Sequence, residues 1–437
     1  MRFTSEVLSR HQGKFQFIKP PSESPAAQHD PRVAEVVSRM LDDIERNGLA
    51  AVREYSRTLD HFEGDLVLDA QDIERSGSRL PDELRRAIEL GSKRTRGFAR
   101  ETRRRLSDFE VETATGITCG VRYVPLRQVG AYLPAGRFPL TASAFMSVGV
   151  AKEAGVDLVT AATPPQPNGR ANDAVMYAAH LSGVDRMYLL GGVQALATLA
   201  FGLLDDLPAD MIVGAGNAYV AEAKRQLFGR VAIDLPAGPS EVALIADGSA
   251  DPEIVAADLL GQAEHGPNSP AALITTSESL GHAVAAAVDE QLATLSTREI
   301  AGPAWRDYGS ITVADGPETV VALMDDLAPE HLEVITEDDA WYHDHLRNYG
   351  SIFLGPWSTV AYSDKGMAGT NHTLPTAGGA KHTAGLSVAR FLKPQTFQRV
   401  RREATPVAAE AVRVISDSEG MEAHSRTATY RLERYAG

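Results

Sequence analysis

The sequence contains a single cysteine, Cys119, among its 437 residues, so an intrachain disulfide is excluded. It also contains no apolar run that approaches the roughly 18 residues needed for a membrane-spanning helix. Residues 1–19 lack the apolar core of a signal peptide. Together these absences predict a cytoplasmic protein with no membrane partner.

Basic residues are the minority among the charged ones, with 43 Lys and Arg against 58 Asp and Glu and a formal net charge of −15. A surface of this sign repels nucleic acid, so no nucleic-acid partner is expected. One local excess of basic residues lies between Lys93 and Arg105. We interpret it as a solvated helix face, paired with Glu89, Glu101 and Asp108, rather than as a polyanion-binding patch.

Helical and strand-like patterns alternate along most of the chain, whose length suits two or three domains. Residues 1–30 are predicted to be a polar arm, residues 31–105 to be helical, and residues 404–437 to be a helical tail. Two blocks between them alternate strand with helix, which predicts two tandem α/β units with mostly parallel sheets. The expected strands are 129–133, 158–161, 187–190, 211–213 and 231–235, then 241–246, 272–275, 310–313, 332–335 and 351–354.

The helix expected at residues 252–264 carries the first candidate site. An Asp-Pro pair predicts its start and a Gly-Pro pair its end. Gln262 and His265 lie three residues apart near that end, and therefore on one face. An amide oxygen and an imidazole placed in this way suit two ligands of a metal, and they also suit a hydrogen-bonding pair at a helix C-terminus.

Two glycine-rich turns follow expected strands. Residues 214–217 (GAGN) follow strand 211–213 and open a helix, where backbone N–H groups attract a phosphate. The third glycine of the dinucleotide fingerprint is missing, because residue 219 is tyrosine. This turn, like the turn at Gly191 and Gly192, therefore fits either a nucleotide-binding loop or a structural turn.

Further chemistry-bearing side chains lie at a strand start, in a loop and in the tail. Glu330 and His331 precede or begin strand 332–335, where they can act as two proton-transfer groups or form an ordinary surface pair. The polar segment 360–385 and the tail supply carboxylate, imidazole and amide donors, which suit zinc or a similar divalent ion. These donors are Asp364, Asn371, His372, His382, Glu419 and His424.

Several of these segments resemble the histidinol dehydrogenase family. The most characteristic run is residues 233–241 (IDLPAGPSE), followed further along the chain by residues 262–265 (QAEH). Matching motifs extend over nearly the whole chain in the family's order. They are residues 132–136 (YLPAG), 191–195 (GGVQA), 214–220 (GAGNAYV), 329–333 (PEHLE), 369–376 (GTNHTLPT) and 419–424 (EGMEAH).

The resemblance implies zinc and NAD as cofactors and a homodimer with shared active sites. The residues that match the family's zinc ligands are Gln262, His265 and Asp364, with His424 supplied by the other subunit. Those that match the acid–base pair are Glu330 and His331. Contacts to NAD are implied for Tyr132, Gln194 and Asn217, and contacts to the substrate for Ser240, His372 and Glu419.

The expected fold is α/β, with two tandem Rossmann-like parallel-sheet domains, a helical N-terminal region and a C-terminal tail. We expect an N-terminal arm at 1–30. A first α/β domain, with the metal and acid–base residues, is expected to combine 31–126 with 241–384. An NAD-binding domain is expected at 127–240, and a tail that reaches the partner subunit at 385–437.

The family's reaction oxidises a primary alcohol, L-histidinol, to a carboxylate, L-histidine, in two NAD-dependent steps through an aldehyde. Beside the third ligand, Ser363-Asp364-Lys365 replaces the family's Gly-Asp-Tyr. This departure is similar to a paralogous branch that includes sulfopropanediol dehydrogenase, and Lys365 adds a cation suited to an anionic substrate. Glu419 is kept and suits the ammonium of an amino alcohol, so both substrates stay open. A non-catalytic relative would be expected to lose ligands or acid–base residues, and none is lost here.

Overall fold

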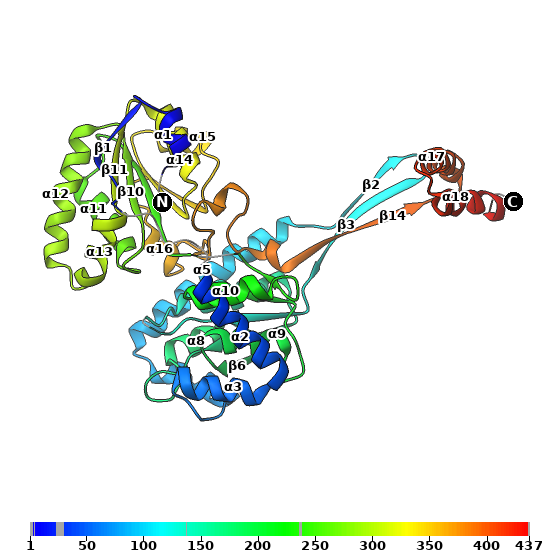
Figure 1. The fold of residues 1–437 in the computed structure, drawn as a ribbon, viewed down its shortest axis with the longest axis horizontal. Helices are drawn as coiled ribbons and strands as arrows, with labels where there is room; N and C mark the ends of the chain where they lie inside the picture. The colour runs from blue at the N-terminus through cyan, green and yellow to red at the C-terminus, as the bar shows by residue number, and fades with distance from the viewer. Residues whose placement is uncertain (1–2, 4, 23–29, 137, 236–237, 436–437) are drawn as a thin grey trace.

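The computed structural model describes residues 3, 5–22, 30–136, 138–235 and 238–435. Parts of the predicted arm and of the 233–241 motif lie outside these residues. The chain forms two units built on largely parallel sheets, and a long antiparallel arm that carries the C-terminal helices away from them (Figure 1). The predicted α/β class with parallel sheets is confirmed.

The first sheet has six strands in the order β1-β11-β10-β9-β12-β13. Its five parallel strands lie within one residue of the predicted bounds and are β9 (Val242–Ala246), β10 (Ala271–Thr275), β11 (Ser310–Ala314), β12 (His331–Ile335) and β13 (Ser351–Leu354). One face is covered by α11 (Pro252–Ala263), α12 (Glu278–Thr294) and α13 (Arg298–Tyr308). The other face is covered by α14 (Pro317–Leu327) and α15 (Asp339–His345).

The N-terminal residues are part of this unit. β1 (Phe15–Lys19) pairs antiparallel with β11, and α1 (Ser5–Arg10) packs Val7 into the core beneath the sheet. The prediction of a polar arm outside the core is therefore wrong for these residues. In the sequence, the neighbouring polar and proline residues obscure a short apolar alternation. Its members, Phe15 and Phe17, pack on the sheet.

The second sheet has five parallel strands in the order β6-β5-β4-β7-β8. They are β4 (Gln128–Tyr132), β5 (Leu158–Thr163), β6 (Arg186–Leu189), β7 (Met211–Val213) and β8 (Ala232–Ile233). The helices between them are α6 (Ala142–Ala144), α7 (Val150–Ala154), α8 (Asp173–Ser182), α9 (Gly192–Phe201) and α10 (Ala218–Leu227). Residues Phe145–Gly149 form a π-helical segment between α6 and α7, so the helical stretch 142–154 is continuous but irregular.

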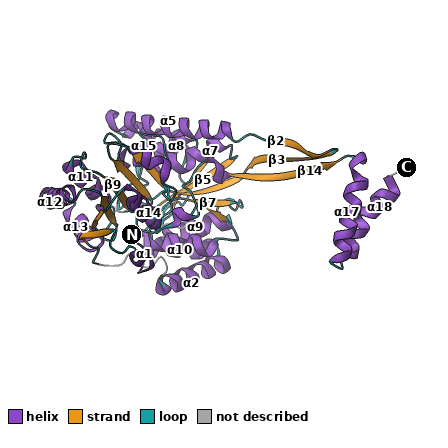
Figure 2. Ribbon diagram, turned by 90° about the horizontal axis from the view of Figure 1, so that it is seen from above, coloured by secondary structure: helices purple, strands orange, loops and turns teal. Residues whose placement is uncertain are grey.

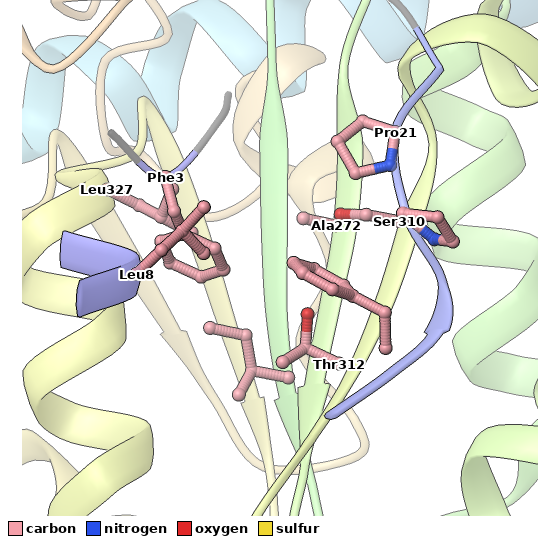
Figure 3. A pocket seen from close by; sticks show the side chains of 10 residues that line it. Phe3, Leu8, Pro21, Ala272, Ser310, Thr312 and Leu327 are labelled. Carbon is pink, nitrogen blue, oxygen red and sulfur yellow. The ribbon is translucent and has the colours of Figure 1, made fainter. Parts of the chain in front are cut away.

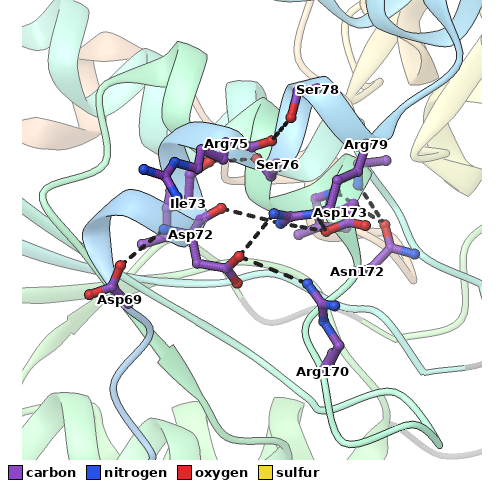
Figure 4. Close-up of polar contacts among 12 residues, drawn as sticks. Asp69, Asp72, Ile73, Arg75, Ser76, Ser78, Arg79, Arg170, Asn172 and Asp173 are labelled. Carbon is purple, nitrogen blue, oxygen red and sulfur yellow. Dashed lines mark hydrogen bonds and ion pairs between the residues drawn. The ribbon is translucent and has the colours of Figure 1, made fainter.

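The helices that precede this sheet pack against it. They are α2 (Pro31–Asn47), α3 (Leu49–Tyr55), α4 (Ala70–Arg75) and α5 (Asp82–Arg105), and their buried side chains belong to the cores around β4 to β7. Arg79 binds Asp72 at 2.9 Å and Asp173 of α8 at 2.7 Å (Figure 4). The predicted grouping of 31–126 with 241–384 is therefore wrong for residues 31–105. A helical pattern reveals that one face is buried, but not which sheet buries it.

A three-stranded antiparallel sheet, β14-β3-β2, forms the arm. Its strands are β2 (Phe109–Ala114), β3 (Ile117–Pro125) and β14 (Leu392–Val400), and α17 (Thr405–Ser418) and α18 (Glu422–Tyr435) lie at its far end (Figure 2). The predicted helical tail is confirmed. Several apolar side chains of these two helices are exposed, among them Val407, Val414, Ile415 and Tyr430.

The basic run on α5 forms an ion-paired helix face, as predicted, and Glu101 is one of its partners. The prediction is wrong for Glu89 and Asp108, which pair with Arg85 and Arg122 outside the run. Arg96 and Arg100 both bind Glu153 at 2.9 Å, and Arg104 binds Glu101 at 2.7 Å. Glu153 belongs to α7, so its role as the main partner was not visible in the local sequence. Among the described residues, no helix combines the length and the apolarity needed to cross a membrane.

Candidate active site

The candidate residues lie at the amino-terminal ends of strands in one sheet and at the carboxyl-terminal ends of strands in the other. In the six-stranded sheet, Glu330 and His331 lie where β12 begins, and Ser240 lies just before β9. In the five-stranded sheet, Tyr132 ends β4, and the turn at Gly214 follows β7. The first group therefore lies at an amino-terminal edge and the second at a carboxyl-terminal edge, which is the usual ligand-binding edge of an open α/β sheet.

Gln262 and His265 lie at the C-terminal end of α11. Gln262 is 2% exposed, and both atoms of its amide lack a hydrogen-bond partner among the described residues. The predicted alternative, a hydrogen-bonding pair at the helix end, is therefore wrong. A buried amide without a partner costs roughly 1–3 kcal/mol. Nε2 of His265 lies 3.6 Å from Oδ2 of Asp364, so a carboxylate and an imidazole lie close together beside α11.

Asp364 ends the short helix α16 (Val360–Asp364) and lies among three imidazoles. Burial favours a higher pKa for this carboxyl, but the charges of His372, His331 and His265 outweigh it and hold the pKa below its usual value. Asp364 is therefore ionised at neutral pH. A buried, ionised carboxylate beside imidazoles is a suitable ligand for a divalent cation.

The carboxylate of Glu330 is fixed by the residues that precede and begin β9. Its Oε2 accepts hydrogen bonds from Oγ of Ser240 at 2.7 Å and from the N–H of Glu241 at 2.8 Å. Nδ1 of His331 lies 3.4 Å from the same oxygen. Glu330 is 5% exposed and His331 is 2% exposed, so the predicted alternative of a surface pair is wrong.

The ring of His331 has one engaged and one unpartnered nitrogen. Nδ1 lies 3.0 Å from the carbonyl oxygen of Glu241, which can only accept, so Nδ1 carries a hydrogen. Nε2 is buried and has no hydrogen-bond partner among the described residues. Burial favours a lower pKa for this ring, but the charge of Glu330 and its hydrogen bond, aided by Asp364, raise the pKa of His331 to about 9.

Glu241 is a site residue that the sequence analysis did not single out. Burial and the neighbouring charge of Glu330 raise the pKa of Glu241 to about 7. Its side chain accepts a hydrogen bond from the N–H of Ala377 at 3.0 Å, and its backbone carbonyl accepts from His331. Its position directly after Ser240, at the start of a buried strand, was the available signal.

His372 connects the two units. Its Nε2 lies 3.4 Å from Oγ of Ser143 in α6, and its Nδ1 lies 3.3 Å from the backbone oxygen of Asp364. Burial lowers the pKa of His372, although Asp364 opposes this shift. The adjacent Asn371 donates a hydrogen bond to the backbone oxygen of Met146 at 2.8 Å. The loop that follows α16 therefore brings His372 to the border between the sheets.

The donors within one chain fit a divalent metal but form an incomplete set. The unpartnered amide of Gln262, the imidazole of His265 and the carboxylate of Asp364 are suitable ligands for zinc. In the described part of the chain, no three or more His, Cys, Asp or Glu side chains cluster as a metal site. His424, like Glu419, is exposed at the far end of the arm, so one chain does not bring it to the other three donors (Figure 2).

The three residues matched to NAD contacts lie at turns beside the five-stranded sheet. Oη of Tyr132 accepts a hydrogen bond from the N–H of Gly192 at 3.2 Å. Nε2 of Gln194 donates to Asp60 at 2.9 Å. Asn217 caps α10, because its Oδ1 accepts from the first free N–H groups of that helix at 3.0 and 3.1 Å.

The glycine-rich turn after β7 is held by an ion pair that the sequence did not reveal. Gly214 has a φ of +121°, and a Cβ there would lie 2.2 Å from the carbonyl oxygen of Tyr132. Its N–H donates to Asp234 at 2.8 Å, and its carbonyl accepts from Lys224 at 2.9 Å. Lys224 and Asp234 are buried and form an ion pair. The backbone of this turn therefore requires glycine and is fixed from both sides.

The apolar pocket in Figure 3 lies apart from these residues. It is lined by side chains on the face of the six-stranded sheet opposite α11, including Phe17, Ile274 and Thr312. None of the predicted site residues lines it. Its lining is mostly apolar and does not supply the chemistry described above.

Comparison with known proteins gives consistent matches over nearly the whole chain. A family model described as histidinol dehydrogenase matches residues 23–432. A histidinol dehydrogenase homolog of Shouchella clausii is 46% identical over 96% of this chain and 99% of its own length. The sulfopropanediol 3-dehydrogenase of Ruegeria pomeroyi is 43% identical over 92% of this chain and 93% of its own length. The crystal structure of histidinol dehydrogenase from Elizabethkingia anophelis has a TM-score of 0.91 at 32% identity and covers 100% of this chain and 98% of that chain.

Proposed function

The chain belongs to the histidinol dehydrogenase family of oxidoreductases, and we propose that it oxidises a primary alcohol to a carboxylate in two NAD-dependent steps through an aldehyde. One observation carries this proposal. Asp364 lies 3.6 Å from His265 and is acted on by His331, whose Nε2 is buried and has no partner among the described residues. The amide of Gln262, buried and likewise unpartnered there, lies in the same backbone turn as His265.

Zinc is the proposed metal, held by Gln262, His265 and Asp364 of one chain and by His424 of a second copy in a homodimer. When bound, zinc would hold the oxygen of the substrate and compensate the charge of Asp364. The distance between His424 and the other donors within one chain supports the assignment of His424 to a second copy, because the arm places it well away from its own sheets (Figure 1).

His331, in its neutral form, acts as the base that removes the hydroxyl proton in each oxidation step. Because its pKa is raised to about 9, the ring is mostly protonated at neutral pH, and the rate is expected to grow as the pH rises towards 9. Its Nδ1–H bond to Glu241 aims the other nitrogen, Nε2, at the substrate. Glu330 acts on the water that adds to the aldehyde between the two steps. Its carboxylate is held by Ser240 and by the N–H of Glu241, so it can accept a proton from a water at a fixed position.

The five-stranded sheet is the proposed Rossmann-like dinucleotide-binding unit, with Tyr132, Gln194 and Asn217 at its carboxyl-terminal edge. NAD, when bound there, accepts the hydride of each step. The turn at Gly214, which is fixed from both sides, and the start of α10 support this placement, because the dipole of a helix start attracts phosphate. The proposed substrate contacts of the same chain are Ser240, which donates to Glu330, and His372, which lies 3.4 Å from Ser143 of the other unit. Glu419 is the proposed contact from the second copy.

L-histidinol, oxidised to L-histidine, is the first candidate substrate, because Glu419 suits the ammonium of an amino alcohol. A second candidate is 2,3-dihydroxypropane-1-sulfonate, oxidised to 3-sulfolactate. Two observations favour this second candidate: the charge of Lys365 acts on both Asp364 and His372, and a close relative is named as a sulfopropanediol dehydrogenase. A cation at this position suits a sulfonate group.

The test is NADH formation by the zinc-loaded protein with L-histidinol, each dihydroxypropanesulfonate enantiomer and simple diols. If a sulfonate is the substrate, Lys365→Ala raises its KM strongly, and the effect shrinks with added salt. If L-histidinol is the substrate, Lys365→Ala is nearly silent and Glu419→Gln is damaging. No NADH with any of these alcohols would contradict the proposed reaction.

A further inference from the structure

Two carboxyl groups that are not among the proposed catalytic residues lie next to those residues. Asp258 lies one helical turn before Gln262 on α11, so the two side chains project from the same face. Glu333 lies two residues after His331 on β12, so these two also share a face. That face of β12 is the one covered by α11, and the two carboxyls meet between the helix and the strand.

Both carboxyls bind the start of α16, the short helix that ends at Asp364. Oγ1 of Thr359 donates to Oδ1 of Asp258 at 2.9 Å. The N–H of Val360 donates to Oε1 of Glu333 at 2.7 Å. The pair therefore connects three elements: α11 with Gln262 and His265, β12 with His331, and α16 with Asp364.

The environment of Glu333 makes this connection specific. Glu333 is 0% exposed, and its Oε2 has no hydrogen-bond partner among the described residues. Burial and the charge of Asp258 raise the pKa of Glu333 well above its usual value, whereas His331 opposes this shift. Burial also raises the pKa of Asp258. Two neighbouring buried carboxyls cannot both ionise readily. The contacts of this pair to the start of α16 are therefore made inside a buried environment, in which losing a partner is costly.

We propose that Asp258 and Glu333 are positioning residues that hold the start of α16 against α11 and β12, and so place Asp364 beside Gln262 and His265. The inference rests on the proposed function, because it concerns the proposed zinc ligands. Both residues would then affect zinc binding without touching the substrate or the metal. Groups that orient metal ligands commonly affect metal affinity by 10- to 100-fold.

The test compares Glu333→Gln with Glu333→Leu in the full-length protein. Glutamine keeps an acceptor for Val360 and gains a donor for Asp258, whereas leucine has a similar size and neither function. We expect Glu333→Gln to keep zinc affinity within about threefold and Glu333→Leu to lose about 10- to 100-fold. Zinc affinity is measured by competition with a chromophoric chelator, and circular dichroism establishes that each variant is folded.

A second pair of variants tests the proposal independently, in case Glu333→Leu does not fold. Thr359→Val removes the hydroxyl that donates to Asp258 and that caps α16 by accepting from the N–H of Ala361, and Thr359→Ser keeps both contacts. Weaker zinc binding by Thr359→Val than by Thr359→Ser is expected. Wild-type zinc affinity in both folded Glu333→Leu and Thr359→Val would overturn the positioning role alone. Absence of zinc binding by the unaltered protein would instead overturn the proposed metal site, and this inference with it.

Discussion

The imidazole of His331 donates its Nδ1 hydrogen to the backbone carbonyl of Glu241, 3.0 Å away, across two neighbouring strands. A backbone acceptor cannot be titrated, so the bond selects one tautomer of the neutral ring and leaves Nε2 for proton transfer. The same residue, Glu241, donates its N–H to Glu330. The start of β9 therefore orients both members of the proposed acid–base pair.

Replacement of the acid–base pair should separate its two roles. His331→Ala is expected to slow both oxidation steps by roughly 10²- to 10⁴-fold, since each step removes a hydroxyl proton. Glu330→Gln should impair oxidation of added aldehyde more than the first oxidation of the alcohol, because only the former needs activated water. Single-turnover NADH formation from each substrate measures the two steps. Equal rates of aldehyde oxidation by Glu330→Gln and the unaltered protein would rule out the water-activating role.

Metal removal should abolish activity reversibly. The buried amide of Gln262 has no hydrogen-bond partner among the described residues, and His265 lies 3.6 Å from Asp364, so these side chains are available to a metal. Dialysis against a chelator is therefore expected to stop NADH formation. Added zinc should restore it and should also raise the melting temperature, because a ligand that binds only the folded state stabilises that state. Elemental analysis provides the control. Undiminished activity in protein shown to be free of metal would refute the assignment.

The proposed shared site predicts complementation between inactive variants. His265→Ala and His424→Ala should each be inactive alone, because each lacks one ligand. After subunit exchange, a mixed dimer would hold one site with both defects and one site with neither. Random pairing gives about half mixed dimers, so about a quarter of the sites should be intact. If mass spectrometry verifies the exchange and no activity returns, His424 either completes the site of its own chain or is not a ligand.

The turn at Gly214 offers a test of the dinucleotide site with a matched control. Gly229 also has a positive φ, +103°, but a Cβ there would meet no atom within 4 Å. Gly229→Ala should cost about 1–3 kcal/mol from backbone strain and leave the KM for NAD unchanged. Gly214→Ala should destabilise the protein more and raise that KM, because its Cβ would displace Tyr132. Denaturant unfolding and NAD titration measure the two effects. Equal KM values in both variants would argue against NAD binding at this turn.

Local patterns in the sequence predicted the parallel strands well. The strands of the six-stranded sheet alternate with helices and are apolar throughout, so each was visible without its neighbours. Antiparallel β2, β3 and β14 were missed, because the side chains of β2 and β14 are mostly exposed and those of β3 are mostly half-buried, so no fully buried face imposes a pattern. Strand β1 was missed for a related reason, since it is short and lies at a sheet edge.

The chemistry of the site was only partly visible in the sequence. Gln262 lies in the last turn of α11 and His265 lies two residues after its end, in a backbone turn closed by the bond from the N–H of His265 to the carbonyl of Gln262, so local spacing was enough to pair them. Asp364 reaches them from about a hundred residues away, and only the family resemblance linked it to them. Glu241, Asp258 and Glu333 were not recognised, because a carboxylate in a strand or helix does not reveal that it is buried. Their roles come from contacts across three elements, which no single segment encodes.

The arm has a consequence for the behaviour of the protein in dilute solution. The helices α17 and α18 lie far from the sheets of their own chain and expose Val407, Ile415 and Tyr430. If another copy receives them, catalytic competence depends on protein concentration as well as on folding. Specific activity should then fall on dilution while each isolated chain keeps its secondary structure. A loss of this kind would be recovered by concentration, unlike a loss caused by denaturation.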